Sequence, residues 1–191
     1  MTRNIWIYII LLFLSYEPPL CAAQEEDSLL GTFVVTAYNI ANEADWPCQD
    51  TDKILAKGLD SYYCPGFLKD ILLQGSGVDN SGSSIQIDWS MGSPSTAANT
   101  YFRYVPYIET ASGNELEDGV SIAVDTSVIP FNTWVYIEEV GFRRADDTGG
   151  NINGNRIDVF MNVPNEEARN FGKKQLKVWI RQPPQHTGIY V

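Results

Sequence analysis

The sequence is poor in the side chains that most often carry nucleophilic and metal-dependent chemistry. Its 191 residues include one histidine, His186 near the C-terminal end, and three cysteines. A Ser/His/Asp triad and a Cys/His pair both need a histidine beside the nucleophile, and a zinc site needs several histidine or cysteine ligands. An EF-hand calcium loop is missing too, because Asp79-Asn80-Ser81-Gly82 lacks the downstream glutamate. The remaining candidate chemistry is that of carboxylates, and no metal ion or cofactor is expected.

Basic residues are also scarce. Lys and Arg number 13 against 24 Asp and Glu, so the net charge is -11 and the sequence pI is about 4.4. Such a surface repels phosphate backbones and anionic lipid, which argues against nucleic-acid binding and against electrostatic docking on membranes or anionic wall polymers. Hydrophobic residues make up 44% and aromatic residues 12%, which is enough for a packed core. The length suits one domain, or one domain with an insertion.

Long hydrophobic runs are missing, apart from one near the N-terminus. Arg3 precedes an apolar run over residues 5–14, and Pro18-Pro19 and the small residues Ala22-Ala23 follow. This order is typical of a secretory signal peptide, which we expect to span residues 1–23. A retained membrane anchor is the alternative, but the run is too short to span a bilayer comfortably. The mature protein is expected to be exported and to have no stable membrane span.

Cysteine in the mature chain is limited to Cys48 and Cys64, since Cys21 leaves with the signal peptide. An even pair of cysteines in an exported protein indicates one disulfide. The bond would close a loop of about 15 residues, which the chain-entropy model credits with roughly 3 kcal/mol. Two free thiols are the alternative, and they fit an oxidising compartment less well.

Short strand-like segments follow one another along the mature chain. Alternating or β-branched and aromatic patterns predict strands over residues 32–38, 84–89, 101–105, 120–124, 133–140, 142–145, 156–160 and 175–181. Pro164 and Gly172 bound a short helix with Glu166 and Glu167 in its first turn. A short helix over 52–57, a further element over 67–73 and a turn over 74–82 are also expected.

These elements predict a mainly β, barrel-like fold with short helical decorations. Residues 24–119 are expected to supply the N-terminal barrel strand or strands and an insertion stapled by the disulfide. Residues 120–181 are expected to form the core of the same barrel, and residues 182–191 a tail.

Three aspartates lie at or beside apolar runs between residues 122 and 160. They are Asp125, Asp147 and Asp158. A carboxylate at the edge of a hydrophobic strand is costly unless it is hydrogen-bonded or functional. The three together indicate a shared acidic site, and cleavage of a glycosidic bond is the commonest acid/base chemistry of carboxylates.

Two other interpretations of these aspartates are open. Asp147-Thr148-Gly149 matches the motif of aspartic proteases, but that chemistry needs two such carboxylates and the chain has one copy, so an obligate homodimer would be required. The aspartates could instead cap turns and accept backbone N–H bonds. Gly149 and Gly150 would then serve a turn, because glycine permits positive φ and close backbone approach.

The segment from residue 120 to 180 resembles the three-aspartate, or 3D, domain, which also forms the catalytic part of the membrane-bound lytic transglycosylase A family. Thr36-Ala37-Tyr38 resembles the first barrel strand of that family, and Gly75-Ser76-Gly77 a motif of its longer members. The combined spacing is far more specific than Asp-Thr-Gly-Gly alone. The matching motifs are Ser121-Ile122-Ala123-Val124-Asp125, Val128-Ile129-Pro130, Val135-Tyr136-Ile137, Ala145-Asp146-Asp147-Thr148-Gly149-Gly150, Gly154-Asn155-Arg156-Ile157-Asp158 and Glu166-Glu167-Ala168 with Phe171-Gly172.

The resemblance implies a six-stranded double-psi β-barrel with the aspartates in a groove on one face. The last of the three aspartates is the catalytic acid in such transglycosylases, so that role falls on Asp158, with Asp125 and Asp147 in support. To act near neutral pH, Asp158 needs a raised pKa, which apolar neighbours and the like charge of the other two aspartates are expected to supply. The groove would be lined by Thr36, Tyr38, Gly149 and Gly150.

The implied partner is the peptidoglycan glycan strand of a bacterium, and the implied location is secreted, periplasmic or in the cell envelope. The implied reaction cleaves the bond between N-acetylmuramic acid and N-acetylglucosamine and leaves a 1,6-anhydro product. A non-catalytic, expansin-like module that binds or loosens the wall is one alternative. A polysaccharide hydrolase is another, with Asp158 as the acid and Asp125 or Asp147 as the base.

The sequence departs from the family pattern at three places. Asn132 stands where the family usually has glycine, in Phe131-Asn132-Thr133, Asn151 replaces a usual alanine, and Asn153 replaces a frequent lysine. The chain is also too short for the large extra domain of lytic transglycosylase A. A weaker grip on the glycan, or help from a partner, is therefore expected.

Overall fold

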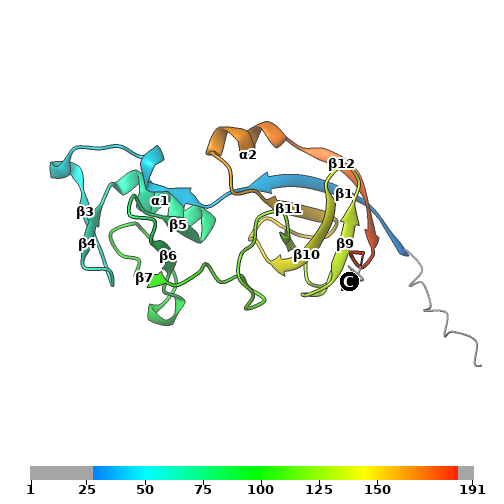
Figure 1. The fold of residues 1–191 in the computed structure, drawn as a ribbon. Coiled ribbons are helices and arrows are strands. Elements are labelled where there is room, and N and C mark those ends of the chain that lie inside the picture. Colours follow the sequence, from blue (N-terminus) through cyan, green and yellow to red (C-terminus); the bar gives the residue numbers. More distant parts are fainter. Residues whose placement is uncertain (1–27, 185–191) are drawn as a thin grey trace, which may run out of the picture.

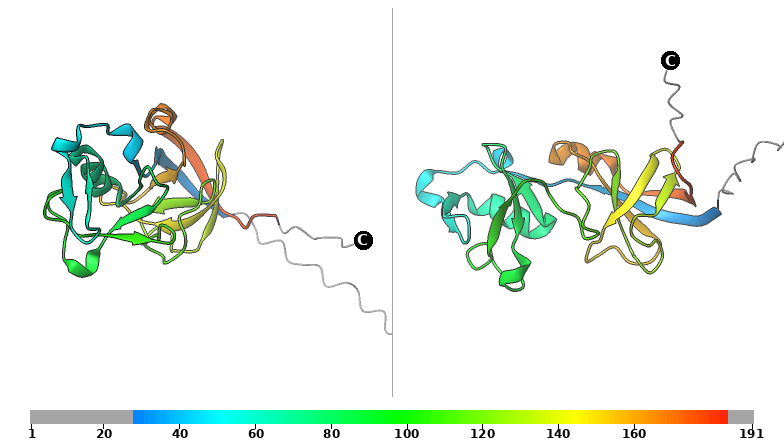
Figure 2. Two further views of the ribbon diagram at one scale, coloured as in Figure 1. Left: turned by 60° about the vertical axis from the view of Figure 1, so that its left-hand side comes forward. Right: turned by 60° about the horizontal axis from the view of Figure 1, so that its bottom comes forward.

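The computed structural model describes residues 28–184. The predicted signal peptide over 1–23 and residues 185–191 of the predicted tail lie outside this range. The described chain forms two lobes, a closed barrel and a second lobe that is inserted between the barrel strands β1 and β8 (Figures 1 and 2). Within residues 28–184, no helix combines the length and the apolar character needed to cross a membrane.

Six strands close the barrel. Their order is β1 (Ser28–Tyr38), β11 (Arg156–Phe160), β8 (Ser121–Val124), β10 (Gly141–Asp147), β9 (Trp134–Ile137) and β12 (Lys174–Ile180). The pairs β1–β11 and β10–β8 are parallel, and the remaining neighbours are antiparallel. The predicted mainly β fold with a six-stranded barrel is confirmed.

The barrel interior is filled by alternate residues of its strands. Since successive side chains of a strand point to opposite faces, an apolar residue at every second position packs inside and its neighbours face outward. Helix α2 (Asn165–Phe171), close to its predicted range, packs beside β1 and contributes Phe171, which packs against the barrel core. The buried strand residues include Val35, Ile122, Val124, Val135, Ile137, Ile157, Val159 and Val178.

The second lobe has a hydrophobic core of its own. A sheet in the order β2 (Ala41–Asn42), β5 (Ser76–Val78), β6 (Ser84–Ile87) and β7 (Phe102–Val105) packs against helix α1 (Pro65–Gln74), and a hairpin of β3 (Ile54–Ala56) and β4 (Ser61–Tyr63) lies beside them. Pro65 starts α1 and Gly75, at φ 86°, ends it in a left-handed conformation that suits glycine. The core side chains include Phe67, Leu68, Ile71, Ile85, Ile87 and Phe102.

Two local predictions in this lobe are wrong. The helix expected over 52–57 is a 3-10 turn over Asp50–Asp52 followed by β3, because Ala56 is buried in the lobe core and its strand pairs with β4. The turn expected over 74–82 contains β5. Gly77 pairs there with Ala41, and a Cβ at Gly77 would lie 2.8 Å from the carbonyl oxygen of Ala41. Gly77, which indicated a turn in the sequence, is therefore needed so that β5 can lie close to β2.

Cys48 and Cys64 form a disulfide, with their Cα atoms 5.9 Å apart. The bond fastens the segment before β3 to the residue that precedes α1. Trp46 reinforces this attachment, because its ring covers Gly66 so closely that a Cβ there would lie 2.4 Å from Cε3. The Trp46 indole N–H also donates to Asp70 of α1 over 3.1 Å.

The longer connection between the lobes, residues 106–120, is bonded to both of them. On the second lobe, the Gln86 side chain donates to the Glu109 carbonyl oxygen over 2.8 Å and accepts from the Glu109 N–H over 3.1 Å. On the barrel, the Ser112 N–H donates to the Asp146 carbonyl oxygen over 2.8 Å. The connection therefore holds the second lobe in a defined position against β10.

Replacing Cys48 and Cys64 together by serine should destabilise the second lobe. The bonded residues are 16 apart in sequence, and a loop of this size is worth about 3 kcal/mol in the chain-entropy model. Chemical denaturation followed by tryptophan fluorescence measures the loss. As a control, a reductant should lower the unfolding midpoint of the unmodified protein and leave that of the serine variant unchanged. Equal midpoints for both proteins without reductant would contradict this.

Candidate functional site

A row of outward-facing side chains crosses four neighbouring strands of the barrel. Strand pairing places Thr36 of β1 beside Asp158 of β11, Asp158 beside Ala123 of β8, and Ala123 beside Asp147 of β10. Residues opposite each other in paired strands project from the same face of a sheet. Val124, the next residue after Ala123, is buried in the barrel core. The row therefore lies on the outside of the barrel, with the two carboxylates on either side of a small alanine.

A β-bulge in β10 sets the position of Asp147. The pairing with β8 moves from Ala145 opposite Ile122 directly to Asp147 opposite Ala123, so Asp146 is the extra residue. A bulge leaves one residue unpaired and redirects the side chains next to it. Without the extra residue, Asp147 would fall one position beyond Ala123 and outside the row.

The carboxylate of Asp146 is fully buried and has three side-chain donors. The Ser121 hydroxyl lies 2.7 Å away, the Asn114 amide nitrogen 2.9 Å and Arg144 Nε 2.7 Å. Asn114 also donates over 2.7 Å to Asn132, whose φ of 65° suits asparagine nearly as well as the glycine of the family pattern. Asp146 and Asp147 are neighbours in the sequence. No local sequence pattern shows that Asp146 is the buried one and Asp147 the one in the row.

Asp158 is partly buried on the outer row. Its Oδ1 atom accepts a 2.8 Å hydrogen bond from the Thr36 hydroxyl. Burial raises the pKa of Asp158 above its ordinary value, while the Thr36 hydrogen bond and the positive charge of Arg156 act in the opposite direction. The carboxyl is therefore easier to protonate than an exposed aspartate, and burial is the main cause.

Asp147 is held by donors from three segments. Its Oδ1 atom accepts from the Ala111 N–H over 3.1 Å and from the Thr148 N–H over 2.9 Å. Its Oδ2 atom lies 3.4 Å from the Tyr38 hydroxyl. Burial first, then the negative charges of Asp147 and Asp158, raise the pKa of Tyr38, so Tyr38 stays a neutral donor to Asp147.

Asp125 does not join these two aspartates. It follows Val124, which pairs with Ile157, so it lies along β8 on the side of the row away from Tyr38. Its Oδ1 atom accepts from the Ser127 N–H over 2.9 Å and from the Ser127 hydroxyl over 2.6 Å, and its Oδ2 atom accepts from the Gly154 N–H over 2.7 Å. These bonds lower the pKa of this exposed carboxyl. The contacts of Asp125 are those of a turn cap.

The two predicted groove glycines have different surroundings. A Cβ at Gly149 would lie 2.8 Å from Cγ1 of Ile152, whereas a Cβ at Gly150 would meet nothing within 4 Å. Packing against Ile152 thus accounts for Gly149. Neither glycine lines the cavity beside the row, and their contact with a substrate stays a prediction.

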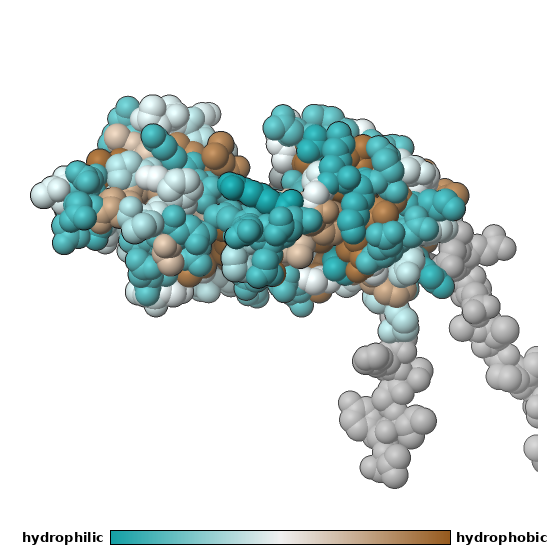
Figure 3. All heavy atoms as spheres, turned by 90° about the horizontal axis from the view of Figure 1, so that it is seen from above, coloured by the Kyte–Doolittle hydropathy of each residue, from teal (hydrophilic) through white to brown (hydrophobic). Residues whose placement is uncertain are grey.

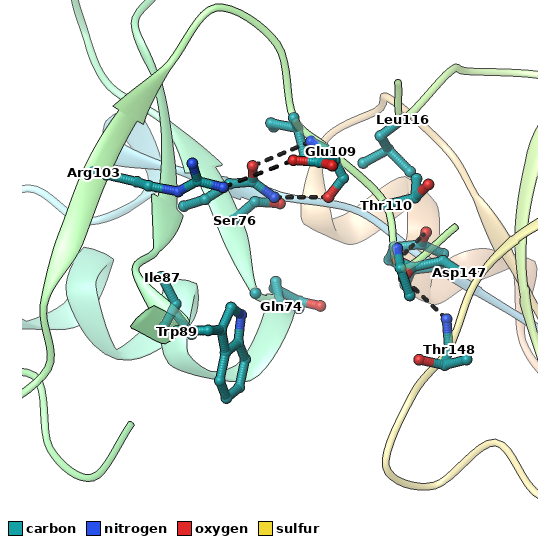
Figure 4. A pocket seen from close by; sticks show the side chains of 15 residues that line it. Gln74, Ser76, Ile87, Trp89, Arg103, Glu109, Thr110, Leu116, Asp147 and Thr148 are labelled. Carbon is teal, nitrogen blue, oxygen red and sulfur yellow. Dashed lines mark hydrogen bonds and ion pairs between the residues drawn. The ribbon is translucent and has the colours of Figure 1, made fainter. Parts of the chain in front are cut away.

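A cavity of about 390 Å³ lies between the barrel and the second lobe (Figure 4). Seen from above, the molecular surface is hollowed between the two lobes (Figure 3). The barrel side is formed by Tyr38, Asp147 and Thr148, and residues 108–111 with Leu116 of the connection form the floor. Asp158 is not among the lining residues, but it lies in the same row as Asp147, with Ala123 between them. The second-lobe wall consists of Gln74, Gly75, Ser76, Gln86, Ile87, Trp89 and Arg103.

The second-lobe wall belongs to the part of the chain where the sequence carries no recognisable catalytic motif. Its residues come from the end of α1, from β5, β6 and β7 and from the turn after β6, and only folding brings them opposite the barrel. Among the described residues 28–184, no group of three or more His, Cys, Asp or Glu side chains is arranged to hold a metal ion.

Comparison with known proteins gives a family match and similar proteins that include two of Bacillus subtilis. Residues 120–182 match the model of the 3D domain family, in agreement with the resemblance of the motifs. The chain is 47% identical over 75 residues to "Cell wall-binding protein YocH" of Bacillus subtilis, a match that covers 37% of this chain and 25% of that protein. It is 40% identical over 74 residues to "Putative cell wall shaping protein YabE" of the same species, covering 37% and 18%. The chain thus spans a quarter or less of these relatives.

Solved structures with a similar fold include the lytic transglycosylase MltA of Escherichia coli. MltA with bound chitohexaose aligns with a TM-score of 0.59 at 14% identity, over 81% of this chain and 73% of that chain. A membrane-bound lytic murein transglycosylase of Agrobacterium tumefaciens aligns at 0.53 and 13% identity, over 78% and 73%. At such identities the likeness shows the fold. The aligned 81% of this chain is more than the barrel alone, and residues 39–118 build a second lobe with a hydrophobic core of its own.

Replacing Ser121 by alanine should destabilise the barrel and disturb Asp147. The Ser121 hydroxyl bonds to a carboxylate without water access, and loss of a hydrogen bond to a charged group costs about 1.5–3 kcal/mol. Urea denaturation measures the change. Ser127→Ala is the matched control, since it removes the same type of bond from the exposed Asp125 and should cost less. Equal losses at both serines would contradict the structural importance of the bulge.

Replacing Asp158 by asparagine should stabilise the fold at neutral pH. A carboxyl with a raised folded pKa contributes its stability below its unfolded pKa of about 3.9 and loses it as the pH rises through the folded value. The stability difference between variant and unmodified protein should therefore grow as the pH rises from acid to neutral. Thermal unfolding at several pH values measures this. Asp125→Asn should show the opposite sign, because the pKa of Asp125 is lowered and its contribution is lost as the pH falls.

Proposed function

We propose that this protein is an exported lytic transglycosylase that cleaves the glycan strands of bacterial peptidoglycan, with Asp158 as its acid. The observation that carries the proposal is a partly buried carboxyl with a raised pKa, in one row with a second carboxylate beside an open cleft. Relatives named for wall binding and wall shaping and the complex of MltA with chitohexaose support a glycan of the cell wall as the ligand.

The geometry of Asp158 assigns its two oxygen atoms different tasks. Thr36 donates to Oδ1, so the acidic proton is carried by Oδ2. Oδ2–H protonates the glycosidic oxygen as the bond from C1 of N-acetylmuramic acid breaks, and N-acetylglucosamine leaves with a new hydroxyl group. The Asp158 carboxylate then accepts the proton of the muramoyl 6-hydroxyl while O6 bonds to C1. Asp158 ends protonated, as it began, and no water is consumed.

Asp147 serves as a fixed negative charge beside the reacting sugar. Two backbone N–H groups and Tyr38 hold its oxygens in place, so it needs no reorganisation when positive charge develops at C1. Tyr38 fixes Asp147 and faces the cleft. Asp125 takes a supporting role through the turn at Gly154, two residues before β11, which carries Asp158.

A hydrolase would need a second carboxylate that is free to activate water. Both oxygens of Asp147 have donors, and Asp125 is bonded to Ser127 and Gly154. Transglycosylation needs one acid that later acts as a base, which suits the arrangement better. A non-catalytic wall-binding module is the second candidate, and it is favoured by the printed name of the relative YocH.

Digestion of purified peptidoglycan sacculi by the mature protein tests the proposal. We expect muropeptides with 1,6-anhydro ends, identified by mass spectrometry. Asp158→Asn should lower their rate of release by at least about 100-fold, because it removes the general acid. Asp52→Asn is the matched control, since Asp52 is exposed on the second lobe and should leave the rate unchanged.

Products with reducing ends in place of anhydro ends would identify a hydrolase. Binding to sacculi without any released product would support the wall-binding module. Anhydro products that persist in Asp158→Asn would show that another residue is the acid.

A further inference from the structure

The second-lobe wall of the cleft presents an exposed aromatic ring opposite the carboxylates. Trp89 is 64% exposed although it lines the cavity, and its indole lies on the second-lobe side of the cleft, with Asp147 and Thr148 on the other side (Figure 4). An indole ring buries a large apolar area when it is covered, so leaving it in water forgoes a substantial stabilisation. Its flat face offers a stacking surface for a sugar ring.

The position of Trp89 is set by a stiff turn. Trp89–Met91 form a single 3-10 turn, and the Asp88 carboxylate caps it by accepting from the Ser90 N–H over 3.1 Å and from the Ser90 hydroxyl. The Asp88 N–H donates to the Tyr101 carbonyl oxygen over 2.9 Å, which anchors the turn beside the start of β7. The backbone that carries the ring is therefore fixed before a ligand arrives, which lowers the entropic cost of binding.

A guanidinium group stands on the same wall. Arg103 of β7 pairs across the sheet with Gln86, whose amide is fully used by the backbone of Glu109. Arg103 Nη2 is 3.8 Å from Glu109 Oε2, and both side chains are half exposed. That separation exceeds a hydrogen bond, and an exposed pair of this kind contributes little to stability. N–H groups of the Arg103 guanidinium therefore remain available to bind a ligand.

The charge of Arg103 stands out in this cleft. Within the described part of the chain, it is the one basic side chain that lines the cavity, and Asp147 and Glu109 are also there. A cleft for an uncharged sugar has no need of a guanidinium, whereas the planar fork of arginine matches a carboxylate. In a protein of net charge -11, this one positive charge of the cleft, which is only loosely paired with Glu109, gives an anionic substituent a defined place to bind.

We propose that this wall selects sugars with a carboxylate substituent, with Trp89 stacking on the pyranose ring and Arg103 binding the carboxylate. The inference rests on the proposed function for its substrate, and it names two specificity-determining residues outside the segment 120–182. Two carboxylates have this chemistry in peptidoglycan. One is the free lactyl group of muramic acid without a peptide, and the other belongs to an attached peptide.

Binding measurements in the Asp158→Asn background, where turnover is blocked, test the proposal. Calorimetry is done with three ligands: chitotetraose, a tetrasaccharide of alternating N-acetylglucosamine and N-acetylmuramic acid, and the same tetrasaccharide with peptides attached. Trp89→Ala should weaken all ligands that bind by about tenfold, and Trp89→Phe should restore most of the loss. Arg103→Gln should weaken the carboxylate ligands by about tenfold or more and leave chitotetraose unchanged.

Arg103→Lys and Lys173→Gln are the matched variants. Arg103→Lys keeps the charge without the fork and should restore only part of the affinity. Lys173→Gln makes the same change of charge at an exposed position beyond α2 and should change nothing. If Arg103→Gln weakens the peptide-free tetrasaccharide more, the lactyl group is the source of the carboxylate. If it weakens the peptide-bearing tetrasaccharide more, the peptide is the source.

Equal losses for neutral and carboxylate ligands in Arg103→Gln, or no loss for either, would overturn the proposal. So would unchanged affinity in Trp89→Ala. Thermal unfolding of each variant separates these results from misfolding, and Trp89→Phe tests the ring with its volume largely kept. If sacculi yield no anhydro product but the variants change binding as expected, the proposed transglycosylase reaction is wrong and the proposed selectivity of the wall is supported. If products form but both variants bind like the parent, the wall alone fails.

Discussion

The carboxylate of Asp146 is a charge in a place that water does not reach, and the site depends on how that charge is satisfied. Removing such a group from water costs several kcal/mol, which only close donors can offset. Arg144 supplies the opposite charge, and Ser121 and Asn114 supply neutral donors. These partners come from β10, from β8 and from the connection between the lobes. One buried charge thus fastens three segments at the point where the barrel meets the second lobe.

The same contacts decide the geometry of the cleft. Asp146 is the extra residue of the bulge, so holding it inside keeps Asp147 in the outer row. Its carbonyl oxygen accepts from Ser112, and the neighbouring Ala111 N–H reaches the Asp147 carboxylate. Two residues before Ala111, Glu109 is bonded to Gln86 of the second lobe. The two walls of the cleft are therefore joined by a short series of hydrogen bonds, and the cleft exists without a closing motion.

The sequence predicts the barrel well because its strands carry their own pattern. Alternating apolar residues such as those of β11 and β12 are visible without knowledge of their partners, and so are the capping signals around α2. The resemblance of residues 120–180 to the 3D domain adds the closure of the barrel. The local sequence pattern could not show which role each of several aspartates has. Asp125, Asp146 and Asp147 look alike in sequence, and only register and burial separate a turn cap, a buried anchor and a member of the row. Of the wall that carries Trp89 and Arg103, the sequence indicated only Gly75 and Ser76, through the resemblance of Gly75-Ser76-Gly77 to a family motif, because the wall is assembled from segments that meet through tertiary contacts.

The pairing of β1 has a consequence for how the chain acquires its structure. β1 begins at Ser28, yet its two neighbours are β11 and β12, which begin at Arg156 and Lys174. Closing contacts between such distant segments is slow compared with local folding. The second lobe draws all its strands and α1 from residues 41–105, so its contacts are available much earlier in synthesis. The barrel strand that carries Thr36 and Tyr38 waits unpaired until β11 and β12 have been made. The second lobe, which does not carry Asp147 and Asp158, can therefore take shape first.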